Sequence, residues 1–517
     1  MNKAMPKKHT FKRVIKTVIK AYPVLVPIVV VCILFSAIVA AMPDLVLPKV
    51  IGILQDAIET HQTWDEVIVK LMPKLWILIS LYVAALILTV LQTQLLAFMT
   101  QGYLSKMRTN MFNKMQDLPI RFFDQNKHGD IMSYYTNDID TLRELVSQSL
   151  PAIIRAVGVV SFVFFTMLWW SIWLTLIVLV AVALMLVVSK VLGKRTSKYF
   201  IKNQINVGKM EAYAQEMMSG QKVVKVFNHE DETIEGFDHV IEELYDSSYK
   251  SHAYANMLGP IIMSIGNILY VVIALVGGIF CYKGINNLSL SGEVMGLPII
   301  ITFLQMTRQF TGNVNQLSQQ FNSIIMSMAG AGRVFSLMDQ EKEEDDGYVE
   351  LVNCTYDEFG NVVESDVHTG HWAWRHPHQD GTLTYTKLEG DVVLEDVTFG
   401  YVPTKDILHN INVYAKPGQK VAFVGATGAG KTTITNLINR FYDINNGKIR
   451  YDGINVQKIK KADLRRSLGL VLQDTFLFTG TVMENIRYGK LDATDEECIE
   501  AAKLAGADDF ITRLPQG

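Results

Sequence analysis

Gly425-Ala426-Thr427-Gly428-Ala429-Gly430-Lys431-Thr432 is the most informative segment of this 517-residue chain. It matches the pattern G-x-x-x-x-G-K-[ST] and stands between an apolar run at 421–424 and a helical pattern at 433–441. A buried strand, a glycine-rich loop and a helix, in this order, are the context in which the pattern binds phosphate. The segment therefore predicts a nucleotide-binding α/β domain rather than a chance glycine-rich turn.

The residue types in this segment are those that phosphate binding requires. Glycines let the backbone approach phosphate oxygens, and successive N–H groups together with the positive end of the helix form an anion cradle. We expect Lys431 to reach the β- and γ-phosphates and the Thr432 hydroxyl to hold Mg²⁺. The predicted binding residues are Gly425, Ala426, Thr427, Gly428, Ala429, Gly430, Lys431, Thr432 and Thr433.

Upstream of this loop, two patterns extend the same domain. Alternating apolar residues from Val392 to Phe399 mark a strand, and Lys416-Pro417-Gly418-Gln419 marks a turn. Downstream, the apolar residues 468–471 predict a further strand. We expect 421–424 to be a buried strand.

The composition of the whole chain indicates a membrane protein. Hydrophobic residues make up 49% and charged residues 19%, below the roughly 25% charged residues of soluble domains, and the mean hydropathy is +0.20. The 48 basic and 51 acidic residues nearly cancel, which leaves no basic field for a nucleic-acid partner. The four cysteines form no C-x-x-C pair, so neither a disulfide framework nor a thiolate metal site is expected.

The apolar residues lie almost entirely before residue 312, in segments long enough to cross a hydrocarbon layer of about 30 Å. The uncharged run 156–189 would be about 50 Å long as one helix, so we predict two helices with a turn near Trp169, Trp170 and Ser171. The two long loops between the predicted spans, around 100–149 and 190–257, carry helical patterns, so the spans should continue as helices into the cytoplasm. The six predicted spans are approximately 23–42, 75–98, 151–168, 172–191, 258–282 and 290–310.

Basic residues orient these spans. The first 22 residues carry seven Lys or Arg residues and no acid, and the two long loops are also rich in basic residues, so both termini should be cytoplasmic. Apolar residues at helical spacing in 1–22 predict an amphipathic helix in the cytoplasmic interface. The alternative is a cleaved signal peptide that ends at the small residues 37–41, and the five further spans disfavour it.

With six spans ahead of a phosphate-binding motif, the chain resembles one half of an ATP-binding cassette (ABC) exporter. Phe399-Gly400-Tyr401 is similar to the family's aromatic loop, which implies that Tyr401 stacks on adenine. Leu472-Gln473-Asp474 resembles the family's glutamine loop, which implies that Gln473 helps to coordinate Mg²⁺ and the attacking water. The resemblance thus implies ATP and Mg²⁺ as cofactors, with Lys431 and Gln473 as catalytic residues.

The resemblance also implies the fold, a polytopic α-helical membrane domain of six transmembrane helices, type I exporter-like, with long cytoplasmic helical extensions, fused to an α/β P-loop ATPase domain. Arg121-Phe122-Phe123-Asp124 with Gly129-Asp130 looks like the first coupling region of the family, and 207–213 looks like the second. The expected parts are an elbow helix at 1–22, a membrane domain at 23–335 with coupling regions near 119–130 and 207–214, a linker and insertion at 336–390, and a nucleotide-binding domain at 391–517.

The function implied is ATP-driven export of an amphipathic drug, lipid or peptide across the cytoplasmic membrane. Thr307-Arg308-Gln309-Phe310 and the following helix resemble most closely the half-transporters of bacterial heterodimeric drug exporters, which favours a heterodimer over a homodimer. Polar residues near the spans either line a substrate path or join helices by hydrogen bonds. Both interpretations stay open, and the candidates for the path are Arg308, Gln305 and Asn267.

The family's signature segment, its aliphatic run that ends in Asp-Glu, and its switch histidine do not follow Gln473 before the last residue, Gly517. We therefore expect the chain to represent a truncated product or an incomplete reading frame of a longer half-transporter. Hydrolysis by the 517 residues alone is not expected. The alternative function is a nucleotide-binding but non-hydrolysing regulatory or structural subunit of a membrane complex.

The predicted insertion carries four histidines within eleven positions. Such a cluster is compatible with a transition-metal site, but no cysteine or carboxylate completes a known ligand spacing. We therefore favour a surface hairpin packed by tryptophans over a metal site. The residues concerned are His368, His371, Trp372, Trp374, His376 and His378.

Overall fold

The computed structural model describes residues 7–285, 287–292, 294–378, 380–402, 404–472 and 475–514. The chain forms two compact units. The first contains the residues up to Leu118 and Phe122–Lys342, and the second contains Pro119–Arg121 and the residues from Glu343 onward. The predicted linker and insertion at 336–390 therefore do not form a part of their own, because the division falls between Lys342 and Glu343.

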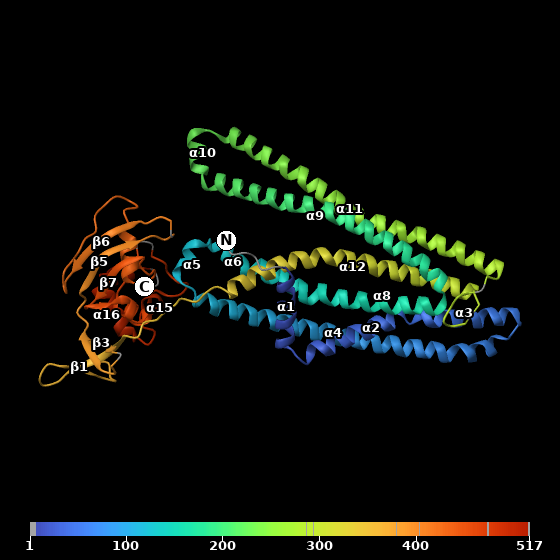
Figure 1. Cartoon of the computed structure of the whole chain (residues 1–517), viewed down its shortest axis with the longest axis horizontal. Coiled ribbons are helices and arrows are strands. Elements are labelled where there is room, and N and C mark those ends of the chain that lie inside the picture. Colours follow the sequence, from blue (N-terminus) through green and yellow to red (C-terminus); the bar gives the residue numbers. More distant parts are fainter. Residues whose placement is uncertain are drawn as a thin grey trace. The chain divides into compact units, whose positions relative to one another are not determined.

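Long helices make up the first unit (Figure 1). The longer ones are α1 (Lys7–Ala21), α2 (Leu25–Ala41), α3 (Pro43–Glu59), α4 (Trp64–Gln116), α8 (Leu150–Trp170), α9 (Ile172–Ser219), α11 (Glu230–Lys283) and α12 (Leu297–Met338). The shorter ones are α5 (Ile120–Gln125), α6 (His128–Ser133), α7 (Ile139–Glu144), α10 (Gln221–Phe227) and two π-helical turns, η1 (Tyr134–Asp138) and η2 (Leu145–Ser149).

Within the described residues, five helical stretches are long and apolar enough to cross a membrane. They correspond to the first five predicted spans, and α4, α9 and α11 continue as helices into the two long loops as predicted. The sixth predicted span, 290–310, falls on α12, which begins only at Leu297. Polar side chains, among them Gln305 and Arg308, interrupt the apolar part of this helix. The five stretches are Leu25–Glu59, Trp64–Gln116, His128–Trp170, Ile172–Ser219 and Glu230–Lys283.

The predicted turn in the uncharged run is confirmed. Helix α8 ends at Trp170 and α9 begins at Ile172, so Ser171 alone separates them. Ser171 is extended (φ −161°, ψ 119°), and its hydroxyl oxygen accepts a hydrogen bond from the backbone N–H of Leu174 at 3.4 Å. The two tryptophans differ, because Trp170 is buried while Trp169 is exposed.

Two predicted loops differ from the structure. The segment 44–74 is mostly helical, because α3 and the first turns of α4 occupy it. The first predicted coupling region coincides with α5 and α6, but α9 continues unbroken through 207–214. The second short helix is instead α10, which joins the ends of α9 and α11 (Figure 1). It lies there because Gly220 ends α9 and the left-handed Asn228 (φ 53°) ends α10.

The amphipathic pattern of α1 is used for packing within the first unit. Val14 and Val18 are buried against residues of α4 and α12, among them Leu104 and Phe335. The guanidinium of Arg13 lies over the Phe335 ring at 4.3 Å. The helix predicted at 1–22 is thus present from Lys7, and its place in a membrane interface stays a prediction.

Two four-stranded antiparallel sheets dominate the second unit, with strand orders β2-β1-β3-β4 and β6-β5-β7-β8. The strands are β1 (Glu350–Tyr356), β2 (Val362–Glu364), β3 (Trp372–Pro377), β4 (Leu383–Lys387), β5 (Val392–Phe399), β6 (Leu408–Ala415), β7 (Asn446–Tyr451) and β8 (Ile454–Asn455). The helices are α13 (Lys431–Ile438), η3 (Val456–Lys458), α14 (Lys461–Ser467), α15 (Val482–Arg487), α16 (Asp495–Leu504) and α17 (Asp508–Ile511).

The histidine-rich insertion is part of this unit. Strands β3 and β4 form the predicted hairpin, but Trp374 is fully buried in the shared core instead of covering a surface. Its indole Nε1 donates to Asp452 Oδ2 at 3.0 Å, and this bond ties the insertion to the turn after β7. Among the described residues, no group of three or more His, Cys, Asp or Glu side chains is placed to hold a metal ion.

Candidate nucleotide-binding site

The glycine-rich loop leads directly into α13, as the sequence predicts. Gly428 and Gly430 both have the left-handed backbone that glycine favours (φ 86° and 88°). A Cβ at Gly430 would lie 2.5 Å from Leu408 Cδ2, and Leu408 is itself buried in β6. Ile434 and Leu437 anchor α13 in the core of the unit, so the loop is held at the N-terminal end of a fixed helix.

Lys431 lies over its own loop. Its ammonium group donates to the backbone carbonyls of Gly425 at 2.8 Å and Ala426 at 2.9 Å. The neighbouring Thr432 side chain is exposed. A cation, an exposed hydroxyl and the positive end of a helix therefore meet at one loop, and this combination suits a phosphate with its divalent metal.

Tyr401 is placed at the first turn of α13. Its hydroxyl lies 3.1 Å from the Thr433 hydroxyl, and its ring packs edge-on against Tyr442 with the centroids 4.9 Å apart. The structure thus brings the predicted adenine-stacking residue next to the phosphate-binding loop, although Thr433 itself is buried. Stacking on adenine stays a prediction.

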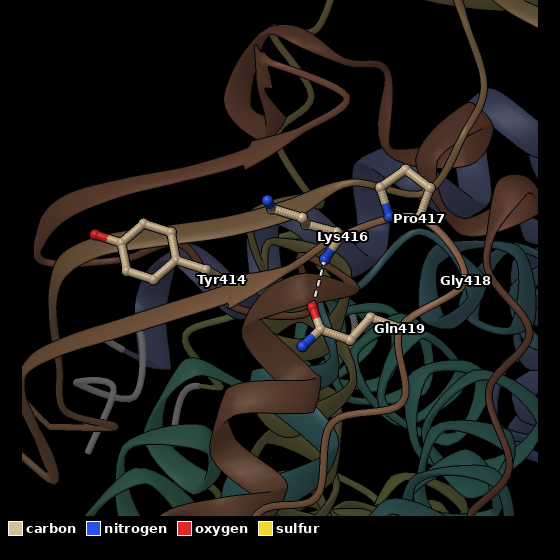
Figure 2. Close-up of a pocket in the computed structure, with 5 residues that line it drawn as sticks. All are labelled: Tyr414, Lys416, Pro417, Gly418 and Gln419. Carbon is tan, nitrogen blue, oxygen red and sulfur yellow. Dashed lines mark hydrogen bonds between the residues drawn. The ribbon is translucent and has the colours of Figure 1, made fainter.

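The turn before the loop is confirmed. Gln419 N–H donates to the Lys416 carbonyl at 2.9 Å, and Gly418 has φ 75°, as a type II turn with Pro417 at its second position requires. Figure 2 shows the Gln419 side chain folded back, so that its Oε1 accepts from the Lys416 N–H at 3.0 Å. This turn carries the chain from β6 to the segment before the loop.

Two strand predictions beside the site are wrong for the structure as described. Residues 421–424 and 468–471 belong to no strand, and Val424 and Val471 are 95% and 92% exposed. A buried parallel strand needs hydrogen-bonded neighbours, and the two sheets pair only β1 to β8. Gln473 lies outside the described residues, so its predicted role is not placed.

The C-terminal end of α13 is surrounded by charges that the sequence did not single out. Arg440 and Lys461 are both 6% exposed, and Arg465 donates to backbone carbonyls at the end of the helix. Their acidic partners include Glu343, in a stretch that reads as a solvated linker. Burial alone would raise the pKa of the Glu343 carboxyl, but hydrogen bonds and charges from Arg465 and Lys461 outweigh burial and lower it.

The polar residues near the spans fall into two groups, one that joins helices and one that holds the three substrate-path candidates. Gln309 donates to the Ala40 carbonyl of α2 at 3.3 Å and so joins two helices. Arg308 and Gln305 are exposed on α12, and the Arg308 guanidinium lies 4.6 Å from the Tyr270 ring of α11. Asn267 is exposed on α11. The structure therefore brings Arg308 to α11, where the cation has an aromatic neighbour.

Two protein-family models match this chain. Residues 30–314 match the ABC transporter transmembrane region, and residues 408–516 match the ABC transporter model. The first match covers most of the first unit, and the second begins at the start of β6 and includes the phosphate-binding loop.

Curated relatives match both parts at once. An uncharacterized ABC transporter ATP-binding protein, YfiC of Bacillus subtilis, is 34% identical over 94% of this chain and 73% of its own length. A fatty acid ABC transporter ATP-binding/permease protein of Mycobacterium tuberculosis is 32% identical over 85% of this chain and 63% of its own length. An ATP-dependent lipid A-core flippase of Syntrophus aciditrophicus is 28% identical over 82% and 64%. The chain thus spans about two thirds to three quarters of these relatives.

Proposed function

This chain belongs to the ABC transporter family as an exporter half-transporter, and from that premise we propose that it powers the export of an amphipathic substrate as one of two paired halves. The observation that carries the proposal is the placement of Lys431 over a glycine loop at the start of α13, in a chain whose described residues include five helical stretches of membrane-spanning length. The names of the relatives, a fatty acid transporter and a lipid A-core flippase, favour a lipid-like substrate.

In the proposed mechanism, the chain's own groups bind and orient ATP. The Lys431 ammonium exchanges the carbonyls of Gly425 and Ala426 for phosphate oxygens, and a charge-assisted bond of this kind contributes about 1.5–3 kcal/mol. Mg²⁺, held by the Thr432 hydroxyl, would neutralise charge that develops on the phosphates. Tyr401 stacks on the adenine, and Gln473 orients the attacking water.

The membrane part supplies one wall of a substrate path. Polar groups are costly against lipid, so the exposed Arg308 and Gln305 of α12 and Asn267 of α11 should face a cavity shared with a second half-transporter. We favour a different chain over a second copy as that partner. The protein lies in the cytoplasmic membrane with both termini and the ATPase domain in the cytoplasm, because the first 22 residues carry basic and no acidic side chains.

ATP-dependent uptake of a fluorescent phospholipid or fatty acid into inside-out membrane vesicles tests this function. The vesicles contain the chain together with a second half-transporter. Lys431→Ala should reduce uptake by about 100-fold, as the loss of one positioned hydrogen-bond donor does in other active sites. Lys420→Ala is the control and should leave uptake unchanged, because that exposed lysine lies outside the loop. Nucleotide binding without ATP-dependent uptake would instead support the alternative, a non-hydrolysing regulatory or structural subunit.

A further inference from the structure

Residues 339–346, which follow the last residue of α12, form a connecting strap, and four of its charged side chains are paired within one unit or the other: Asp339, Lys342, Glu343 and Asp345. The sequence of the strap, Asp-Gln-Glu-Lys-Glu-Glu-Asp-Asp, is typical of a solvated linker. In the structure its first half is bonded to the first unit and its second half to the second unit. The first half ends at Lys342 and the second half begins at the next residue, Glu343.

Two ion pairs hold the first half of the strap. Both guanidinium nitrogens of Arg13 donate to the Asp339 carboxylate, at 2.5 and 2.7 Å. Lys342 Nζ lies 2.5 Å from Asp117 Oδ2 at the end of α4. These pairs keep the residues after Met338 close to α1 and α4, so the strap begins as a continuation of α12 and not as a loose tether.

A bidentate pair holds the second half. Arg465 of α14 donates to both carboxylate oxygens of Glu343, at 2.9 and 2.6 Å. Asp345 accepts from the backbone N–H of Lys461 at 2.9 Å and lies 3.5 Å from the Arg440 guanidinium. Because Arg440 and Lys461 are buried, water cannot readily replace these acidic partners.

Arg465 also reaches the helix that carries the phosphate-binding loop. Its Nε donates to the Asn439 carbonyl at 3.3 Å, and one terminal nitrogen donates to the Arg440 carbonyl at 3.0 Å. These carbonyls follow the last turn of α13, so Arg465 caps the negative end of the helix whose positive end begins at Lys431. One side chain therefore bonds both Glu343 of the strap and the far end of the nucleotide-binding helix.

We propose that Glu343 and Arg465 link nucleotide occupancy of the glycine loop to the C-terminal end of α12 through the connecting strap. The link runs along the covalent chain from one unit to the other. It rests on nucleotide binding at Lys431, as proposed above. A shift of α13 on binding phosphate is passed to Arg465 by its two carbonyl bonds and to Glu343 by its bidentate pair.

Hydrogen exchange of the full chain in lipid nanodiscs, with and without Mg²⁺·ADP, tests the link. In the wild type, we expect nucleotide to slow exchange of the amides of residues 329–339. Glu343→Gln should reduce that nucleotide-dependent change by about fivefold or more, while the nucleotide dissociation constant changes by less than about threefold. The matched control is Glu364→Gln, which removes a carboxylate of the same unit whose partners are Arg375 and Tyr385 and not Arg465.

The outcomes separate this link from a purely structural role and from the function itself. An unaltered response of residues 329–339 in Glu343→Gln, or a wild type that binds nucleotide without any response there, would overturn the link. Arg465→Lys keeps the charge but loses the bidentate geometry, and we expect it to lose the response as well. A wild type that binds no nucleotide would overturn the proposed site, and the link with it.

Discussion

Strand β5 and residues 421–424 are both rich in valine, and they lie in the same unit, but only β5 is paired. β5 stands between β6 and β7, and its Leu394 and Val397 are fully buried. Residues 421–424 have no strand neighbour among the described residues, and Val424 is 95% exposed. The difference teaches that apolar sequence makes a segment capable of forming a strand, whereas its neighbours decide whether it becomes one.

The two segments differ in their strand neighbours because antiparallel and parallel strands are connected differently along the chain. Antiparallel strands such as β5 and β6 pair across a short connection, so they find each other locally. The strand before a phosphate-binding loop belongs to a parallel arrangement, in which each neighbour comes from a distant crossover. Among the described residues, β5 is paired on both sides, whereas the segment 421–424 that leads to the glycine loop is paired with no strand.

The largest expected effect concerns the paired sheets, in which Trp374 belongs to β3. Trp374→Ala should lower the free energy of unfolding of the second unit by about 3–5 kcal/mol, because it empties a fully buried site and leaves Asp452 without its indole partner. Pulse proteolysis of the full chain in detergent measures this. Phe359→Ala is the control, since Phe359 is 89% exposed, and it should stay within about 0.5 kcal/mol of the wild type. Equal effects would mean that the insertion is not part of the core.

The next effect concerns the glycine loop, which follows residues 421–424. Gly430→Ala should cost about 2 kcal/mol in stability, because alanine disfavours φ 88° and its Cβ would meet the buried Leu408. Gly418→Ala has a similar φ of 75° but open space around it, so about 1 kcal/mol is expected. Calorimetric titration with Mg²⁺·ADP should show weaker binding only for the Gly430 variant. Equal results for both would assign the effect to backbone strain alone.

A smaller effect depends on pH and concerns Glu343 of the strap, whose partner Arg465 bonds the carbonyls that follow α13. The lowered pKa of Glu343 means that its contribution to stability is fully present above 4.5, the ordinary value, and is lost as pH falls through its lower value in the folded chain. Glu343→Gln should therefore be about 1 kcal/mol less stable than the wild type at pH 7. That gap should close on acidification in denaturant titrations, and a gap that widened at low pH would contradict the ion pair.

The smallest expected effect bears most directly on the comparison. Val424→Thr should change stability by less than about 0.5 kcal/mol, because the side chain is 95% exposed. Val397→Thr, in the paired strand β5, should cost about 1–3 kcal/mol, since it buries a hydroxyl. Denaturant unfolding of both variants provides the measurement. Similar costs at the two positions would show that 421–424 is buried, as the sequence alone predicts.

Local signals explain what could be predicted from the sequence. The turn at Ser171 follows from an uncharged run too long for one span, and the turn at Lys416 to Gln419 follows from Pro417 and Gly418. The glycine loop and α13 likewise depend on adjacent residues. Each of these features is signalled by one continuous stretch of sequence, even where distant residues add contacts, as Leu288 does by accepting a hydrogen bond from the Ile172 N–H.

The missed features depend on distant contacts. Glu343 and Arg465 are 122 positions apart, and no pattern in an acidic run tells which basic residue it will meet. Trp374 is buried in a core that includes Tyr451, and its indole bonds Asp452, 78 positions away, so the sequence near Trp374 does not reveal that the predicted surface hairpin belongs to the core. The break between α9 and α10 lies at Gly220, beyond the second predicted coupling region, because the helical pattern continues through 207–214.

The single residue between α8 and α9 has a consequence for how the protein is made. Because Ser171 alone separates α8 from α9, the two helices share one very short connection, and this geometry favours their insertion into lipid as a helical hairpin. The uncharged run 156–189 then acts as one apolar unit, and a charge placed near Ser171 would act on both helices at once.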